Sequence, residues 1–119
     1  MHLKIYSRSQ NVNAVIHVHP PYSTALSTCH STVKCITASS IFKLKNIKLI
    51  PYADPGSIEL SNLVEETVSS EDRALVLYSH GIITLDSSLS EAFDIADLVE
   101  ETAVVNFISK LYSSKKVSS

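Results

Sequence analysis

The chain has 119 residues, a length that suits one domain. Ten Lys and Arg residues against twelve Asp and Glu residues give a net charge of −2, so the composition predicts no nucleic-acid or membrane partner. The two glycines, Gly56 and Gly81, lie too far apart to form a G-x-G-x-x-G dinucleotide turn or a P-loop.

The N-terminal sequence has no apolar leader segment, and no run of about 18 apolar residues occurs in the chain. We therefore expect a cytoplasmic protein. Cys29 and Cys35 are too few for a disulfide framework, and their spacing matches no common zinc knuckle. Both are expected to be reduced structural thiols.

The first half of the chain predicts an alternation of helices and strands. Residues 1–10 resemble the end of a helix, and residues 12–19 form an apolar, β-branched run typical of a buried strand. Pro20 and Pro21 end this strand and open a helix that reaches Thr28, because proline is favoured in a first turn. Residues 32–45 give no clear pattern.

The next elements are a strand over residues 47–52 and a helix over residues 58–68, with Ser57 as its N-cap. The apolar run of residues 74–78 predicts a buried strand, and residues 82–85 predict another strand after a bend at Gly81.

The last element is a long helix that begins at a capping box formed by Ser88 and Glu91. Its apolar residues recur at steps of three and four, which predicts one buried stripe. The stripe contains Ala92, Ile95, Ala96, Val99, Ala103, Phe107 and Leu111. Residues 113–119 are expected to be a polar, frayed tail. The order of elements predicts an α/β domain in which helices cover a sheet.

Three of the five histidines are candidates for a metal site. His17 and His19 are two residues apart on one strand, so their side chains lie on the same face. His80 ends another buried strand and precedes Gly81, a position at which a side chain is often directed into a site. Three imidazoles are a typical ligand set of catalytic zinc. Alternatively, each histidine is a hydrogen-bonded core or surface residue.

Four groups of residues, in this order along the chain, resemble the class II aldolase/adducin family. They are His17-Val-His19-Pro20, then Pro51-Tyr52-Ala53 with Gly56-Ser57-x-Glu59-Leu60, then His80-Gly81, and then Glu91-Ala92-Phe93 with Glu100-Glu101-x-Ala103. The resemblance spans residues 1–112. It implies an α/β/α fold with a central, mainly antiparallel sheet, and it implies that His17, His19 and His80 bind Zn²⁺ or another divalent metal.

The chain also departs from the family. Family enzymes are longer, and the part ahead of this chain holds the substrate-phosphate loops and the glutamate that acts as acid/base. No catalytic or substrate-binding residue is therefore assigned here. The nearest acidic residues, Asp54, Glu59 and Asp86, are expected to be solvated. His2 is expected to be structural, and His30 matches none of the family motifs.

The resemblance implies a metal-dependent aldolase-type lyase that acts on a sugar phosphate such as fuculose 1-phosphate. It also implies a homo-oligomer, with a tetramer as the family pattern. Catalysis is expected to be complete only when the N-terminal portion is supplied. Two alternatives remain: a non-catalytic, adducin-like assembly module, and an inactive fragment. The presence of all three histidines favours the enzyme.

Overall fold

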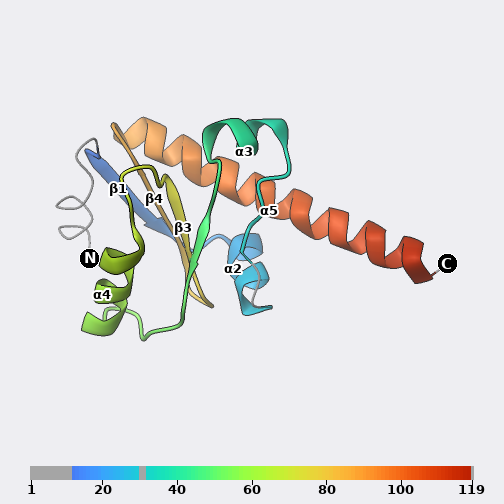
Figure 1. The fold of residues 1–119 in the computed structure, drawn as a ribbon, viewed down its shortest axis with the longest axis horizontal. Helices are drawn as coiled ribbons and strands as arrows, with labels where there is room; N and C mark the ends of the chain where they lie inside the picture. The colour runs from blue at the N-terminus through green and yellow to red at the C-terminus, as the bar shows by residue number, and fades with distance from the viewer. Residues whose placement is uncertain (1–11, 30–31, 119) are drawn as a thin grey trace.

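A four-stranded sheet with the strand order β1-β4-β3-β2 forms the centre of the molecule in the computed structural model, which describes residues 12–29 and 32–118 (Figure 1). β4 pairs antiparallel with both β1 and β3, and β2 pairs parallel with β3. The predicted mainly antiparallel α/β fold is therefore confirmed. In chain order the elements are β1 (Ala14–Val18), α2 (Pro21–Thr28), α3 (Ala38–Lys43), β2 (Lys48–Ile50), α4 (Ile58–Thr67), β3 (Ala74–Leu77), β4 (Gly81–Asp86) and α5 (Leu89–Ser118).

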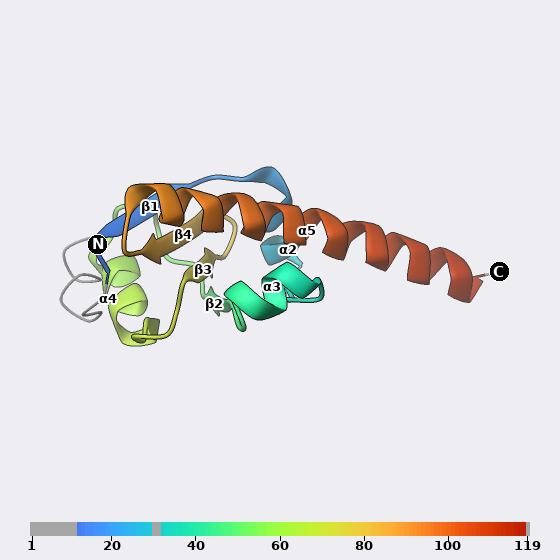
Figure 2. The same ribbon diagram turned by 90° about the horizontal axis from the view of Figure 1, so that it is seen from above.

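Helices cover both faces of the sheet, with α4 on one side and α2, α3 and α5 on the other (Figures 1 and 2). Successive side chains of β3 point to opposite faces. Leu75 and Leu77 join the core beneath α4, whereas Ala74 and Val76 join the core beneath α5. All four residues of β3 are buried for this reason.

The predicted helix that begins after Ser57 is confirmed in α4. The Ser57 side chain accepts a hydrogen bond from the Leu60 backbone N–H at 3.1 Å, as an N-cap does. Leu60 and Val64 are buried, so one face of α4 packs on the sheet. β1, β2 and β3 are shorter than the runs that predicted them, and β2 ends where Pro51 removes a backbone donor, whereas β4 is one residue longer at each end than the predicted 82–85.

α5 begins at Leu89, where the Ser88 hydroxyl accepts a hydrogen bond from the Glu91 backbone N–H at 3.2 Å. The Glu91 carboxylate accepts a hydrogen bond from the Ser87 hydroxyl. The predicted capping box is therefore formed only in part. Its serine caps the helix, but the glutamate hydrogen-bonds to a neighbouring side chain.

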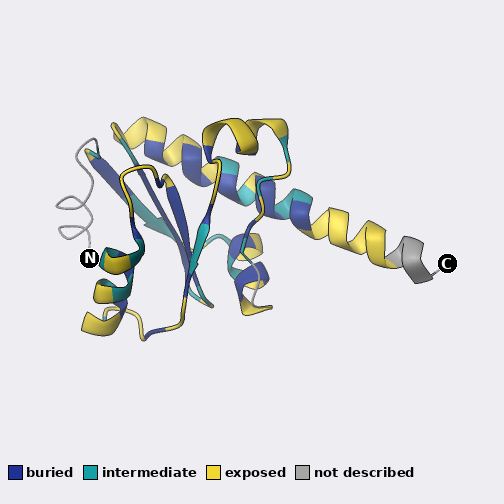
Figure 3. Cartoon of the chain, in the orientation of Figure 1, coloured by how far each residue is buried: buried dark blue, intermediate teal, exposed yellow. Residues whose placement is uncertain are grey.

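The C-terminal part of α5 corrects two expectations. The polar composition of residues 113–119 predicts a frayed tail, but the helix continues to Ser118, because no glycine or proline follows Gly81 to stop it. Phe107 and Leu111 belong to the apolar stripe, yet they are 42% and 56% exposed. The distal part of α5 runs past the edge of the sheet (Figure 3), and Phe107 packs against the half-exposed Tyr22 of α2, with ring centroids 5.7 Å apart, instead of against the sheet.

Residues 32–45, which give no clear sequence pattern, contain the short helix α3. Its N-cap is Thr37, whose side chain accepts from the Ser40 backbone N–H while the Ser40 hydroxyl accepts from the Thr37 backbone N–H. Such a short helix has no long apolar period to reveal it. The helix end expected at residues 1–10 lies outside the described residues. Within the described ranges, none of the helices has the length and apolar character that a membrane span requires.

We expect Leu75→Ala to lower the free energy of unfolding by about 2–5 kcal/mol, because Leu75 is fully buried and its loss leaves a cavity. Urea unfolding followed by circular dichroism measures the change. Leu89→Ala is the control, since Leu89 is 66% exposed and the same substitution there should cost about 0.5 kcal/mol or less. Equal losses in the two variants would contradict the described core.

Candidate metal centre

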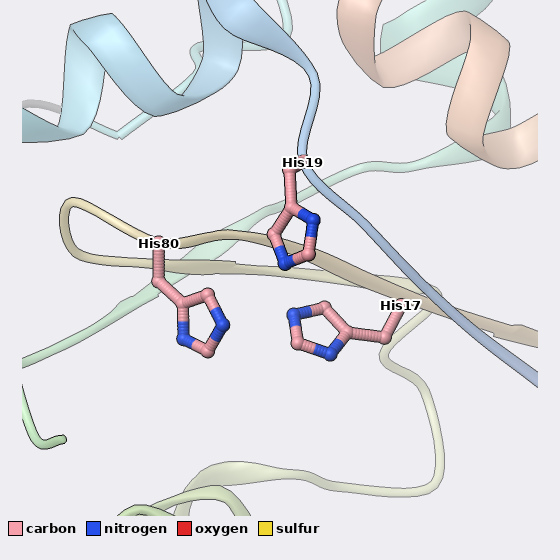
Figure 4. A group of neighbouring side chains, drawn as sticks. All are labelled: His17, His19 and His80. Atoms are coloured by element: carbon pink, nitrogen blue, oxygen red, sulfur yellow. The ribbon is translucent and has the colours of Figure 1, made fainter. Parts of the chain in front are cut away.

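The three histidines predicted as metal ligands come together at one end of the sheet (Figure 4). His17 lies in β1, His19 follows that strand, and His80 lies in the turn between β3 and β4. The antiparallel pairing places Val18 opposite Ile82, so the end of β1 lies beside the beginning of β4. The sheet register therefore brings His80 to two residues that lie far ahead of it in the sequence.

The rings face a common space and lie close to one another. Ring centroids are 4.9 Å apart for His17 and His19, 4.7 Å for His17 and His80, and 5.3 Å for His19 and His80. One nitrogen from each ring lies within 4.8 Å of the other two. Ligands on one zinc ion lie about 3–4 Å apart, since each Zn–N bond is about 2.0–2.1 Å. Small ring rotations are therefore enough to place all three on one ion.

Gly81 permits the close approach of the two strands. A Cβ atom at this position would lie 2.3 Å from the Val18 carbonyl oxygen and 3.0 Å from Cδ2 of His19. The preceding turn is also unusual, because Ser79 has a φ of +56°, in the left-handed region that disfavours side chains. The His80 backbone N–H closes this turn by donating to the Leu77 carbonyl oxygen at 3.0 Å.

The electrostatics of His80 suit a metal ligand. Burial and the nearby charge of His19 lower the pKa of His80 below its ordinary value of 6.5, so the ring is neutral at pH 7 and keeps a lone pair for coordination. Nδ1 of His80 is buried and has no hydrogen-bond partner among the residues that the structure describes. A buried polar atom in this state is costly, and coordination would satisfy it.

Carboxylates do not join the histidines within residues 12–29 and 32–118. Asp54 accepts a hydrogen bond from the Tyr52 hydroxyl at 3.0 Å, and this bond raises the pKa of Tyr52. Glu59 is exposed on α4. Asp86 pairs with Arg73 at 3.0 Å and lies at the end of β4 opposite to Gly81. The cluster thus offers three imidazole ligands and no acid/base group from these positions.

The remaining histidines and the cysteines are separate from this cluster. His2 and His30 lie outside the described residues. Cys29 is exposed and Cys35 is partly buried, both as free thiols. Burial raises the pKa of the Cys35 thiol. A reduced state agrees with the expectation for both, whereas the exposure of Cys29 gives that thiol no packing role.

Sequence reasoning missed two side chains that support the site. The Ser27 hydroxyl accepts from the Ser79 backbone N–H at 2.8 Å, and the Glu100 carboxylate accepts from the backbone N–H groups of Tyr22 and Ser23, each at 2.9 Å. Nothing in the local sequence indicates this role of Ser27, because its partner Ser79 is 52 positions away. Glu100 belongs to one of the family motifs, but its position in that motif does not indicate which groups its carboxylate contacts.

Comparisons with known proteins show which proteins this chain resembles. The family described as "Class II Aldolase and Adducin N-terminal domain" matches residues 1–107. An L-fuculose phosphate aldolase of Methanococcus maripaludis is 38% identical over 108 residues, which are 91% of this chain and 58% of that protein. A 3-oxo-tetronate 4-phosphate decarboxylase of Escherichia coli is 30% identical over 112 residues, or 90% of this chain and 52% of that protein.

A solved structure of an L-fuculose-1-phosphate aldolase is also similar to this chain. The crystal structure of L-fuculose-1-phosphate aldolase from Thermus thermophilus matches with a TM-score of 0.82 and 25% identity. The match covers 95% of this chain and 60% of that one. The chain therefore spans between half and two thirds of the length of each of these three proteins.

We expect Gly81→Ala to lower the free energy of unfolding by about 1–3 kcal/mol, because the added Cβ must push the Val18 carbonyl away. Ser79→Gly in the same turn is the control. Glycine adopts a positive φ without strain, so that variant should be as stable as the wild type or more stable. Urea unfolding measures both, and an undiminished stability of Gly81→Ala would contradict the close approach of β1 and β4.

In the metal-free protein we expect His80 to titrate below pH 6.5, as measured from the imidazole C–H resonances by NMR. The folded state then binds fewer protons than the unfolded state, so this group lowers stability as the pH falls through 6.5. His19→Asn should raise the His80 pKa only in part, because burial is the larger cause. A midpoint at or above 6.5 would be incompatible with this environment.

Proposed function

The chain belongs to the class II aldolase and adducin family, and we propose from this that it forms part of a metal-dependent, aldolase-type lyase. The proposed substrate is a sugar phosphate, with L-fuculose 1-phosphate as the first candidate. The names of both relatives include a phosphorylated compound: L-fuculose phosphate for the M. maripaludis aldolase, and 3-oxo-tetronate 4-phosphate for the E. coli decarboxylase. The support is therefore stronger for a phosphorylated substrate than for any one member of that class.

The observation that carries the proposal is the convergence of His17, His19 and His80. Their ring nitrogens would hold one divalent metal, with zinc as the first candidate, because three neutral imidazoles are typical of catalytic zinc sites. Such a metal, when bound, supplies a Lewis acid that polarises substrate oxygen atoms. The protein supplies the fixed ligands and a turn that aims His80 at the two others.

A lyase of this kind also needs a group that moves a proton, which typically contributes about 10²–10⁴-fold to the rate. Asp54, Glu59 and Asp86 lie outside the histidine cluster, as described above. We therefore assign the acid/base group to a part of the protein other than the described residues. The relatives' greater length supports this assignment, because this chain spans only 58% of the M. maripaludis aldolase.

We also propose that residues 1–112 act as the family domain, with residues 113–119 as a polar end, and that the protein works in the cytoplasm as a homo-oligomer, a tetramer by family resemblance. Four large apolar side chains on the distal part of α5 support self-association, because an exposed apolar patch is often a contact surface. They are Phe107, Ile108, Leu111 and Tyr112.

The test combines metal content with activity. Purified wild-type protein should hold about one Zn²⁺ per chain. When the part that carries the acid/base group is supplied, it should release dihydroxyacetone phosphate from L-fuculose 1-phosphate in a coupled NADH assay; without that part, cleavage should stay near a metal-only background. His19→Ala should lose both properties, because two imidazoles rarely keep zinc against buffer. His30→Ala is the matched control and should keep both, since His30 is not one of the three proposed ligands.

The same measurements separate the proposal from its alternatives. Trace metal in both the wild type and His19→Ala would favour an adducin-like assembly module or an inactive fragment. Stoichiometric metal in the wild type, with cleavage no faster than in His19→Ala even when the part that carries the acid/base group is supplied, would support the metal site and contradict the proposed lyase activity on this substrate.

A further inference from the structure

Two of the three buried residues of helix α2 are serines. Ser23 and Ser27 are both fully buried. A buried hydroxyl is unfavourable unless it is hydrogen-bonded, so each must have a partner that compensates its burial. One partner of each lies in a distant part of the sequence: Ser23 bonds to Glu100 on α5, and Ser27 bonds to Ser79, which directly precedes His80.

The first connection is at the N-terminus of α2, directly after His19. The N-cap is Pro20, which offers no side-chain acceptor, so the first free backbone N–H groups of the helix need an acceptor from elsewhere. One oxygen of Glu100 accepts from the Tyr22 N–H, and the other accepts from both the N–H and the hydroxyl of Ser23, all at 2.9 Å. A carboxylate at this end is also favoured by the helix dipole.

The second connection is near the C-terminus of α2, beside His80. The Ser27 hydroxyl donates to the Thr24 carbonyl oxygen at 2.6 Å and accepts from the Ser79 N–H at 2.8 Å. Ser79 is the residue with a φ of +56°, a conformation that persists only where the surroundings enforce it. Ser27 therefore holds the turn from which the His80 side chain projects.

We propose that Ser27 and Glu100 are positioning residues for the three-histidine site, and that α2 links its two halves. Glu100 fixes the backbone that follows His19, and Ser27 fixes the backbone that precedes His80. The two histidines are 61 positions apart in sequence (80 − 19), so their relative placement depends on such contacts. The inference rests on the proposed function, because it requires the histidines to bind a metal.

Groups that orient metal ligands from outside the first coordination sphere typically change metal affinity by about 10–100-fold. Ser27→Ala removes the acceptor for the Ser79 N–H. Glu100→Gln keeps the size of the side chain but replaces one accepting oxygen by an NH₂ group, so one of the two backbone contacts is lost. We expect each variant to bind Co²⁺ at least about 10-fold more weakly than the wild type.

The measurement is a Co²⁺ titration of the full chain, followed by visible absorption, which reports both the affinity and the ligand geometry. Two matched controls should stay within about twofold of the wild type. Thr28→Ala removes an exposed hydroxyl of α2 that donates within its own helix, to the Ala25 carbonyl oxygen. Glu101→Gln changes the exposed neighbour of Glu100 on α5.

Circular dichroism and urea unfolding of the metal-free variants separate positioning from general stability. A purely structural role would lower the unfolding midpoint and leave the Co²⁺ affinity and spectrum of the folded protein unchanged. Wild-type affinity in a folded variant therefore overturns the role of that residue. If Ser27→Ala does not fold, Glu100→Gln decides, because Glu100 is only half-buried and the change preserves its shape.

The Co²⁺ affinity of the wild type separates a failure of the proposed metal site from a failure of the proposed positioning roles. Failure of the wild-type chain to bind Co²⁺ would overturn the proposed metal function together with this inference. Normal binding by the wild type with unchanged variants would overturn the positioning roles alone.

Discussion

The close pairing of β1 with β4 is the constraint on which the site depends. Val18 lies opposite Ile82, and the chain passes so near that a single Cβ at Gly81 would contact the Val18 carbonyl oxygen at 2.3 Å. This approach sets the distance between His80 and the pair His17 and His19. A small widening of the pair would separate the rings, since each coordination bond tolerates only a few tenths of an ångström.

The two faces of the sheet are held to their helices by different kinds of interaction. The face beneath α4 is apolar, and hydrophobic burial holds it. The face that carries α2 and α5 also contains buried polar groups, including Ser23, Ser27 and Asn106, each with hydrogen-bond partners. Hydrogen bonds have directional requirements that apolar contacts lack, so these groups can fix a backbone position. Among them, Ser27 bonds to the turn that carries His80, and Ser23 lies at the start of the helix that follows His19.

Local sequence patterns predicted most of the scaffold. The apolar period of residues 58–68 and Ser57 before it located α4, because a helix face and its cap are set within a few residues. The same logic failed at the end of α5. Phe107 and Leu111 continue the apolar stripe, but the sheet beneath them ends, and a periodicity contains no information about where a neighbouring layer stops. α3 was missed because it is only six residues long.

The sequence by itself predicted that His17 and His19, two residues apart, point to the same side of an extended segment, since side chains alternate along an extended chain, although β1 itself ends at Val18. It also determined that a strand and then Gly81 flank His80, and the order of motifs pointed to the family. Only the tertiary structure decided that His80 joins the other two, because strand register and the contacts of α2 govern that distance. Those contacts link Ser27 to Ser79 over 52 positions and Glu100 to Ser23 over 77. Patterns within a few residues of sequence cannot predict contacts over such separations, because these contacts depend on how the whole domain packs.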